Sequence, residues 1–285
     1  MDVSVSVIIP MCNAERYLAA CLDSLVSQDF PPSDYEVILV DNGSTDRSVE
    51  IARGYDRVTL LAEPVPGAYS ARNRGIRAAR GNVLAFTDPD CVPSRSWVRA
   101  VSTAMADASV QLACGRRLSS RPSVLLRSIV DYENTKDSFV LGGDDEELCY
   151  GYTSNMAARR QLFDDLGLFL DRPRGADTLF VRMVAKACSC AAIRYLPDAV
   201  VTHLELDSVS VYFKKVFLYG HHRQRNNSIL RTRALTFAER IAIFRQTVRA
   251  GDYSGTRAAA LLGVLAVGSC VWVLGSASAR LEQTL

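Results

Sequence analysis

Short apolar runs alternate with segments of helical periodicity between residues 3 and 90 of the chain. Within the helical segments, apolar side chains recur three and four positions apart, as on the buried face of an amphipathic helix. This alternation of strand and helix predicts an α/β fold with a mostly parallel, Rossmann-like sheet flanked by helices. The predicted strands are Val3–Pro10, Glu36–Val40, Arg57–Ala62 and Asn82–Thr87.

Polar residues mark the starts of the predicted helices between these strands. Asn13 is predicted to cap the first helix, with Glu15 in its first turn. Ser44 or Thr45 is predicted to cap the second, and the third spans residues 70–79. Side-chain oxygens at these positions would satisfy the free N–H groups of the first helical turn.

The second half of the chain has a less regular pattern. Residues 97–105 are predicted to be helical, and residues 142–147 form a loop rich in glycine and acidic residues. Ser208 is predicted to cap a further helix, and Thr236 with Glu239 has the spacing of a capping box.

The polar turns that follow the predicted strands are expected to meet at one rim of the sheet. Ligands of such sheets bind beyond the carboxyl ends of the strands. The segments Pro10–Asn13, Asp41–Ser44 and Asp88–Asp90 all fall there. The sequence therefore predicts a binding site at this rim.

Two carboxylates at the end of the fourth strand indicate a divalent cation. Asp88 and Asp90 are separated by one residue, so in extended backbone their side chains point the same way. Pro89 favours that conformation, because it fixes its own φ and biases Asp88 away from the helical region. Oxygen ligands suit Mg²⁺ or Mn²⁺, which would balance the charge of a departing diphosphate. An acidic turn without a metal is the alternative for such a short pattern.

Asp41 and Arg72 are candidates for nucleotide contacts. Asp41 ends a buried strand, so its carboxylate can accept from a base N–H or a ribose hydroxyl at the rim. The guanidinium of Arg72 could hold a base carbonyl or a phosphate. Arg74 and Arg77 lie on the same predicted helix, so some of these arginines must simply face water.

Four motifs in this order resemble the family-2 glycosyltransferases. They are Val5–Glu15, Val40–Asp46, Ala71–Ile76 and Phe86–Cys91. The resemblance covers residues 3–205 and is weaker after residue 110. It implies a GT-A fold, an inverting transfer from a nucleoside-diphosphate sugar that is often UDP-linked, and Mg²⁺ or Mn²⁺ as cofactor.

The resemblance also implies roles for individual residues. Asp41 and Arg72 would contact the base, Asp88 the ribose or a metal-bound water, and Asp90 the metal directly, with His203 as a further metal ligand. The predicted donor-binding set comprises Pro10, Asn13, Glu15, Asp41, Asn42, Arg72 and Asp88.

The resemblance assigns the catalytic base to Asp177, which would take the proton of the attacking acceptor hydroxyl. A helix N-cap is the alternative role for this residue. Ala176 stands where the family commonly has a glutamate, and Cys12 stands where it usually has an aromatic residue that stacks on the base. Tyr152 and Asn155 are predicted to lie where the acceptor binds.

Charge is distributed unevenly, although the net charge of the chain is only +2. Residues 214–257 hold ten Lys or Arg and two Asp or Glu, a net of +8. An uncharged run follows at Ala258–Ala279, about long enough to cross the ~30 Å hydrocarbon layer as a helix. The basic excess before it predicts a catalytic domain at the cytoplasmic face of a membrane. The chain also opens on a strand, without a signal-peptide pattern.

The predicted organisation has three parts. Residues 1–205 form the catalytic domain, with a nucleotide-sugar half (1–110) and an acceptor half (111–205). Residues 206–257 form a basic amphipathic helical region, and 258–279 an apolar helix that spans or docks on a membrane, or is buried. We expect a nucleotide sugar and a glycan or lipid-linked acceptor as partners, and no nucleic acid.

Two other functions share the predicted scaffold. A sugar-nucleotide nucleotidyltransferase would need a glycine-rich, basic loop after the first strand, and Pro10–Asn13 contains neither glycine nor a cation. A non-catalytic nucleotide-sugar-binding protein is kept open by Cys12 and Ala176. A nicotinamide enzyme is disfavoured, because no GxGxxG follows the first strand. The eight scattered cysteines indicate reduced, largely buried thiols.

Overall fold

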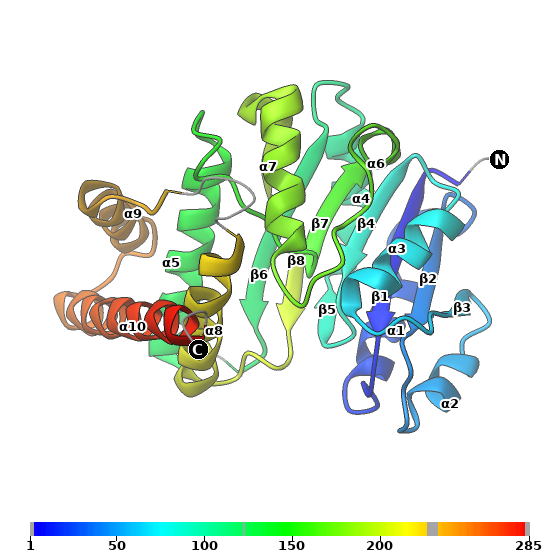
Figure 1. The fold of residues 1–285 in the computed structure, drawn as a ribbon, viewed down its shortest axis with the longest axis horizontal. Coiled ribbons are helices and arrows are strands. Elements are labelled where there is room, and N and C mark those ends of the chain that lie inside the picture. Colours follow the sequence, from blue (N-terminus) through cyan, green and yellow to red (C-terminus); the bar gives the residue numbers. More distant parts are fainter. Residues whose placement is uncertain (1–2, 122, 227–232, 283–285) are drawn as a thin grey trace.

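The computed structural model describes residues 3–121, 123–226 and 233–282. One eight-stranded sheet is covered by helices on both faces, and three helices form an arm at one side (Figure 1). The strands are β1 (Val5–Met11), β2 (Tyr35–Asp41), β3 (Val58–Ala62), β4 (Val83–Thr87), β5 (Cys91–Pro93), β6 (Leu112–Ser119), β7 (Asn155–Arg159) and β8 (Ile193–His203). The helices are α1 (Leu18–Val26), α2 (Ser48–Arg53), α3 (Ala68–Ala78), α4 (Trp97–Met105), α5 (Val124–Leu141), α6 (Arg160–Leu166), α7 (Ala176–Cys188), a 3₁₀ turn (Cys190–Ala192), α8 (Val209–Asn226), α9 (Phe237–Ala250) and α10 (Gly255–Glu282).

The sheet is parallel in its first half and mixed in its second, with the strand order β3-β2-β1-β4-β7-β6-β8-β5. The pairs β1–β2, β2–β3, β1–β4 and β6–β8 are parallel. The pairs β4–β7, β6–β7 and β5–β8 are antiparallel. The four strands predicted from the sequence are β1 to β4, and the α/β prediction with a flanked, mostly parallel sheet is confirmed. The antiparallel insertion of β7 was not predicted.

Alternate residues of the central strands supply two separate cores. On one face, Ile8 and Phe86 pack with α3, α5, α6 and α7. On the other face, Ile9 and Ala85 pack with α1, α2 and α4. Both faces are buried, so these strands are continuous apolar runs without polar alternation, as expected for a parallel sheet between helix layers.

The predicted caps of the first two helices are wrong. α1 begins at Leu18 after Tyr17, and α2 begins at Ser48 after Arg47, neither with a side-chain cap. Asn13 lies four residues before the cap position in a left-handed conformation with φ 49°. The polar side chains of the two loops, Asn13 and Ser44 among them, bond across to each other. The N–H of Ser48, the first residue of α2, donates instead to Asp46 Oδ1.

The arm consists of α8, α9 and α10 and packs against α5. Both caps predicted here are confirmed: the Ser208 hydroxyl accepts from the Val211 N–H, and Thr236 with Glu239 forms a capping box. Ile129 of α5, Ile243 of α9 and Leu261 of α10 share a small core.

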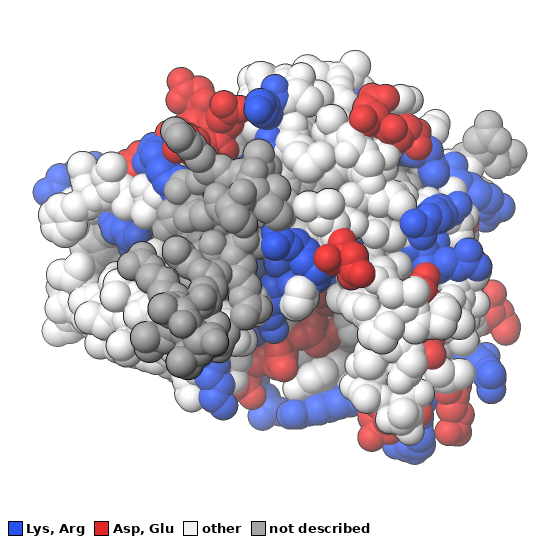
Figure 2. All heavy atoms as spheres, viewed as in Figure 1, with Lys and Arg blue, Asp and Glu red and all other residues white. Residues whose placement is uncertain are grey.

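Helix α10 combines a buried stripe with a long uncharged exposed face. Over Gly255–Ala279 it is long and apolar enough to cross a membrane, with a mean hydropathy of 2.2. Only 17% of its most apolar stretch is buried within the described chain. Leu262, Val267, Val273 and Leu274 are 48–63% exposed. In Figure 2 the described surface over this helix is largely uncharged.

Candidate active site

The rim lies where the strand order reverses. The chain adds β2 and β3 on one side of β1 and then β4 on the other side, so the carboxyl ends of β1 and β4 flank a topological switch point. Their pairing ends at Ile8 and Phe86. Pro10, which has no N–H, lies beyond this point and is paired only with Val40 of β2. Pro10 therefore lies at the rim, but within a buried strand.

Two loops at the rim are joined by hydrogen bonds. The Asn13 N–H donates to Ser44 Oγ (3.0 Å), and Asn13 Oδ1 accepts from the Thr45 N–H (2.8 Å). Glu15 Oε2 accepts from the Arg47 N–H (3.1 Å). Asp41 Oδ1 accepts from the Ser44 N–H, and its other oxygen has no hydrogen-bond partner among the described residues. Asn13 and Glu15 thus bind the two loops together, whereas Asp41 keeps an oxygen for a ligand.

Asn42 uses its whole side chain to fix a third loop. Its Nδ2 donates to the carbonyl oxygens of Glu63 and Val65, both at 2.8 Å. Its Oδ1 accepts from the Gly67 N–H at 2.7 Å. Asn42 was predicted to contact the donor, and the structure instead places it as the residue that shapes the rim.

Arg72 and Asp88 form a partly buried ion pair at the centre of the rim. Arg72 Nη2 lies 2.5 Å from Asp88 Oδ1, and the arginine side chain is only 6% exposed. Its guanidinium lies over the ring of Tyr69, and its buried Nε has no hydrogen-bond partner among the described residues. Arg72 is therefore fixed by α3 and keeps a donor unused.

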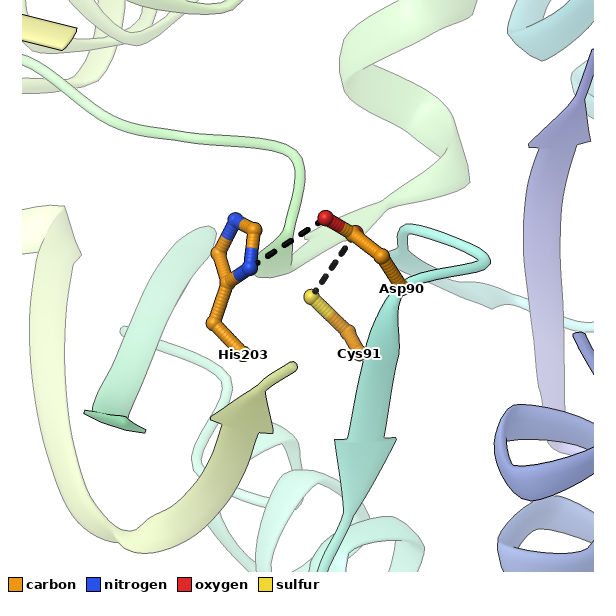
Figure 3. A group of neighbouring side chains, drawn as sticks. All are labelled: Asp90, Cys91 and His203. Atoms are coloured by element: carbon orange, nitrogen blue, oxygen red, sulfur yellow. Dashed lines mark hydrogen bonds and ion pairs between the residues drawn. The ribbon is translucent and has the colours of Figure 1, made fainter. Parts of the chain in front are cut away.

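Asp90 and His203 meet at the end of β4, where β5 begins (Figure 3). Asp90 Oδ2 lies 3.2 Å from His203 Nδ1, and both side chains are at most 20% exposed. Burial, reinforced by Asp88, raises the pKa of Asp90 to about 6. Burial and the nearby Lys215 lower the pKa of His203 to about 3, so its ring is neutral at pH 7 and has a lone pair to offer.

These two side chains fit a divalent cation. His203 Nδ1 is buried and has no hydrogen-bond partner among the described residues, although it faces a carboxylate. A cation between the two groups would satisfy both. Cys91 completes a group of three whose ligand atoms lie within 4.8 Å of one another. Burial next to Asp90 raises the pKa of the Cys91 thiol well above its ordinary value, so it stays protonated and is a poor ligand.

Asp177 lies in the first turn of α7 and is not its N-cap, which is Gly175. Its oxygens accept from the N–H groups of Thr178 (2.8 Å) and Thr153 (3.3 Å). Burial raises the pKa of Asp177, and the charge of Arg72 acts in the opposite direction. The carboxylate is thus held in place by backbone donors and is more basic than an ordinary aspartate.

The two predicted acceptor residues are held by protein contacts. The Tyr152 hydroxyl lies 2.8 Å from Asp137 Oδ2, and the Arg117 guanidinium stacks 3.4 Å above the Tyr152 ring. Asn155 is buried, and its Nδ2 donates to the carbonyl oxygens of Arg116 and Ala199. Its Oδ1 accepts from Trp97 Nε1 at 2.8 Å. This position gives Asn155 a structural role.

We expect Asn155→Ala to destabilise the fold by about 2–3 kcal/mol, because it leaves a buried indole N–H and two carbonyl oxygens without partners. Thermal and urea unfolding would measure the loss. Asn82→Ala is the matched control, since Asn82 is exposed. Unfolding equal to that of the control, combined with loss of acceptor binding, would contradict the structural role.

Sequence reasoning missed two charged residues near the site. Asp137 of α5 is fully buried and accepts from Arg117, Tyr150 and Tyr152. Lys215 of α8 brings its ammonium to 3.0 Å from His203 Nε2. The basic segment that contains Lys215 was recognised, but the face of the helix that it occupies depends on how the arm packs.

Comparisons with known proteins agree with this geometry. Residues 6–167 match the sequence profile of the family described as Glycosyl transferase family 2. The chain is 48% identical over 105 residues to glycosyltransferase AglE of Haloferax volcanii, a match that covers 35% of this chain and 34% of the relative. It is 40% identical over 116 residues to the uncharacterized glycosyltransferase EpsJ of Bacillus subtilis, with 39% and 33% covered. The matches thus span about a third of each of these two relatives.

Solved structures share the fold at low sequence identity. A mannosyltransferase from Pyrobaculum calidifontis, in complex with GDP-Man and Mn²⁺, superposes with a TM-score of 0.65 at 19% identity, covering 99% of this chain and 88% of that one. Residues 1–349 of TarS from S. aureus, in complex with UDP, give a TM-score of 0.56 at 19% identity, covering 98% and 92%.

The sheet and its switch point, shared with these structures, define the GT-A fold. Because the matching residues 6–167 make up more than half of the chain, it belongs to glycosyl transferase family 2. The fold and the enzyme class implied by the four motifs are confirmed.

Proposed function

We propose that the enzyme transfers a sugar from a nucleoside-diphosphate donor to an acceptor hydroxyl by one displacement that inverts the anomeric carbon. The observation that carries this proposal is the buried Nδ1 of His203, which lies 3.2 Å from Asp90 Oδ2 at the donor rim and makes no hydrogen bond within the described part of the chain. GDP-Man with Mn²⁺ in the Pyrobaculum structure and UDP in the TarS structure support a nucleotide sugar as donor.

The contacts of each residue in the proposed site are consistent with a specific role in the reaction. Asp41 and Arg72 hold the nucleotide, and Asp88 orients Arg72 and reaches the ribose. Asp90 and His203 would hold Mg²⁺ or Mn²⁺, which would supply positive charge for the departing diphosphate. Asp177 accepts the proton of the acceptor hydroxyl as the hydroxyl oxygen attacks the anomeric carbon. The bond from that carbon to the diphosphate then breaks.

A donor-hydrolysis screen tests this proposal. UDP- and GDP-linked sugars would be incubated with the enzyme and Mn²⁺ or Mg²⁺, with and without EDTA, and released nucleoside diphosphate would be measured. We expect cleavage of at least one donor that EDTA abolishes and added metal restores. A folded sample with neither metal-dependent cleavage nor metal-enhanced nucleotide binding would refute the proposal.

We also propose that the arm docks on the cytoplasmic face of a membrane, where a lipid-linked or membrane-proximal glycan acceptor is within reach. The exposed face of α10 is uncharged, and the exposed Arg245 and Arg249 of α9 are available to anionic lipid headgroups. The opposite face of α10 packs on α8 and α5, so docking parallel to the surface buries the free face without separating these helices.

Charge on that face should prevent docking. We expect the double variant Val273→Asp with Leu274→Asp to lower binding to vesicles containing anionic lipid by about tenfold or more, because two exposed apolar side chains that would enter the membrane become charged. Vesicle co-sedimentation at low salt measures this. Val65→Asp is the control, because Val65 is 51% exposed and lies far from α10 in the sequence. Equal binding of the double variant and the wild type would contradict membrane docking through α10.

A further inference from the structure

The arm brings a cation directly to the candidate metal site. Lys215 Nζ lies 3.0 Å from His203 Nε2 and 3.4 Å from Glu205 Oε2, and its side chain is 23% exposed. Its neighbour Lys214 is exposed to solvent. The two lysines are therefore chemically alike, and only one faces the rim.

Close contacts with α10 fix the position of helix α8 and so keep Lys215 beside His203. A Cβ at Gly220 would lie 2.3 Å from the carbonyl oxygen of Trp272, and one at Gly275 would lie 2.2 Å from that of Phe217. The Ser276 hydroxyl also donates to the Gly220 carbonyl oxygen at 3.1 Å. These contacts require the backbones of α8 and α10 to touch, and the two helices lie side by side in Figure 1. The Lys215 backbone is thus fixed, while its four-carbon stem stays flexible.

Lys215 would lose its contact with His203 Nε2 when His203 binds a metal. A neutral imidazole has one lone pair, and an ammonium group only donates. Nδ1 is the nitrogen that faces Asp90. When Nδ1 gives its lone pair to a cation, Nε2 carries the hydrogen and no longer accepts from Lys215. Glu205 is then the remaining acceptor, and because its side chain is 56% exposed it holds the ammonium weakly.

We propose that Lys215 is a diphosphate-binding residue, which moves from His203 to the terminal phosphate of the nucleoside diphosphate. The inference rests on the proposed function, because it requires that diphosphate to lie at the Asp90–His203 site. A diphosphate brings several negative charges next to Asp88 and Asp90, and a mobile ammonium a few ångströms away is the natural counter-charge. Lys215 would hold the leaving group as its bond to the sugar breaks.

Calorimetric titration with UDP, GDP, UMP and GMP in the presence of Mn²⁺ tests this role. We expect Lys215→Met to weaken binding of the diphosphates by about tenfold or more, in the range of a charge-assisted hydrogen bond, and to change monophosphate binding little. Lys214→Met should bind like the wild type, and Lys215→Arg should restore most of the diphosphate affinity. Affinity for Mn²⁺ alone, measured by electron paramagnetic resonance, should stay equal or rise, since a nearby cation is removed.

The outcomes distinguish failure of the proposed Lys215 role from failure of the proposed function. Metal-enhanced diphosphate binding that is equal in Lys215→Met and the wild type would overturn the role of Lys215 and leave the proposed function standing. Equal weakening of monophosphate and diphosphate binding, without rescue by arginine, would also overturn it, because that pattern marks a purely structural residue. Absence of metal-enhanced binding in the wild type would overturn the role of Lys215. If metal-dependent donor cleavage were also absent, the proposed function would be overturned as well.

Discussion

Replacing Asp177 with Asn is expected to lower kcat by about 10²–10⁴-fold, the usual contribution of a general base. The amide keeps the size and the hydrogen-bonding positions of the carboxylate but cannot take a proton. Nucleotide binding should therefore be unchanged, which separates a catalytic loss from a folding defect. Steady-state kinetics and nucleotide titration on the same sample measure both quantities.

A matched control is available in the loop before α7. Asp171 is exposed, so Asp171→Asn should behave like the wild type. Burial raises the pKa of Asp177, and the base must be ionised to act, so the wild-type rate should fall with decreasing pH in a higher range than for an ordinary aspartate. An Asp177→Asn variant that retains wild-type kcat would remove this residue from the mechanism.

Replacing Asp90 with Asn is expected to remove metal dependence. The loss of an anionic ligand, and with it the charge stabilisation of the leaving diphosphate, should cost on the order of 10²–10³ in kcat/KM. Mn²⁺ binding followed by electron paramagnetic resonance should weaken in parallel. Asp198→Asn, at an exposed position of β8, is the control and should leave both quantities unchanged.

The pH dependence of metal binding gives a second test of Asp90. Its pKa is raised to about 6, mainly by burial, so protons compete with the cation as the pH falls through this value. Mn²⁺ affinity of the wild type should therefore decline below about pH 6. The decline should be absent in Asp90→Asn, which has no carboxyl group there to protonate. A wild-type affinity that is flat between pH 5 and 7 would argue against Asp90 as the ligand.

The donor rim could be predicted because its parts depend on local sequence and on a general property of parallel sheets. Strands β1 to β4 follow from apolar runs, and the carboxyl ends of parallel strands share one edge. Asp41 and Asp88 were therefore placed correctly at the rim. Asn42 was assigned to the ligand and proves to shape a loop, because the sequence does not show which polar groups at a rim bond to each other.

The packing of the second half of the chain could not be predicted from the sequence, because it depends on contacts between distant segments. The buried face of helix α5 includes a charged residue, Asp137, so the helix has no continuous apolar stripe. The Asp137 carboxylate accepts hydrogen bonds from Arg117 of β6 and from two tyrosines that follow the helix. Strand β7 is short and pairs antiparallel between β4 and β6, a placement with no local signal. Asn155 was predicted to lie where the acceptor binds, although its amide is used by partners from three other elements.

The sequence by itself determined the α/β class, the acidic turn at Asp88 and Asp90, and the apolar character of α10, because each depends on neighbouring residues and on the periodicity of one element. Only the tertiary structure decided that His203 turns Nδ1 toward Asp90, that the Asn155 amide is used up by protein contacts, and that Lys215 rather than Lys214 faces the candidate metal site. These outcomes depend on contacts between segments far apart in the chain, whose packing fixes which way each side chain points.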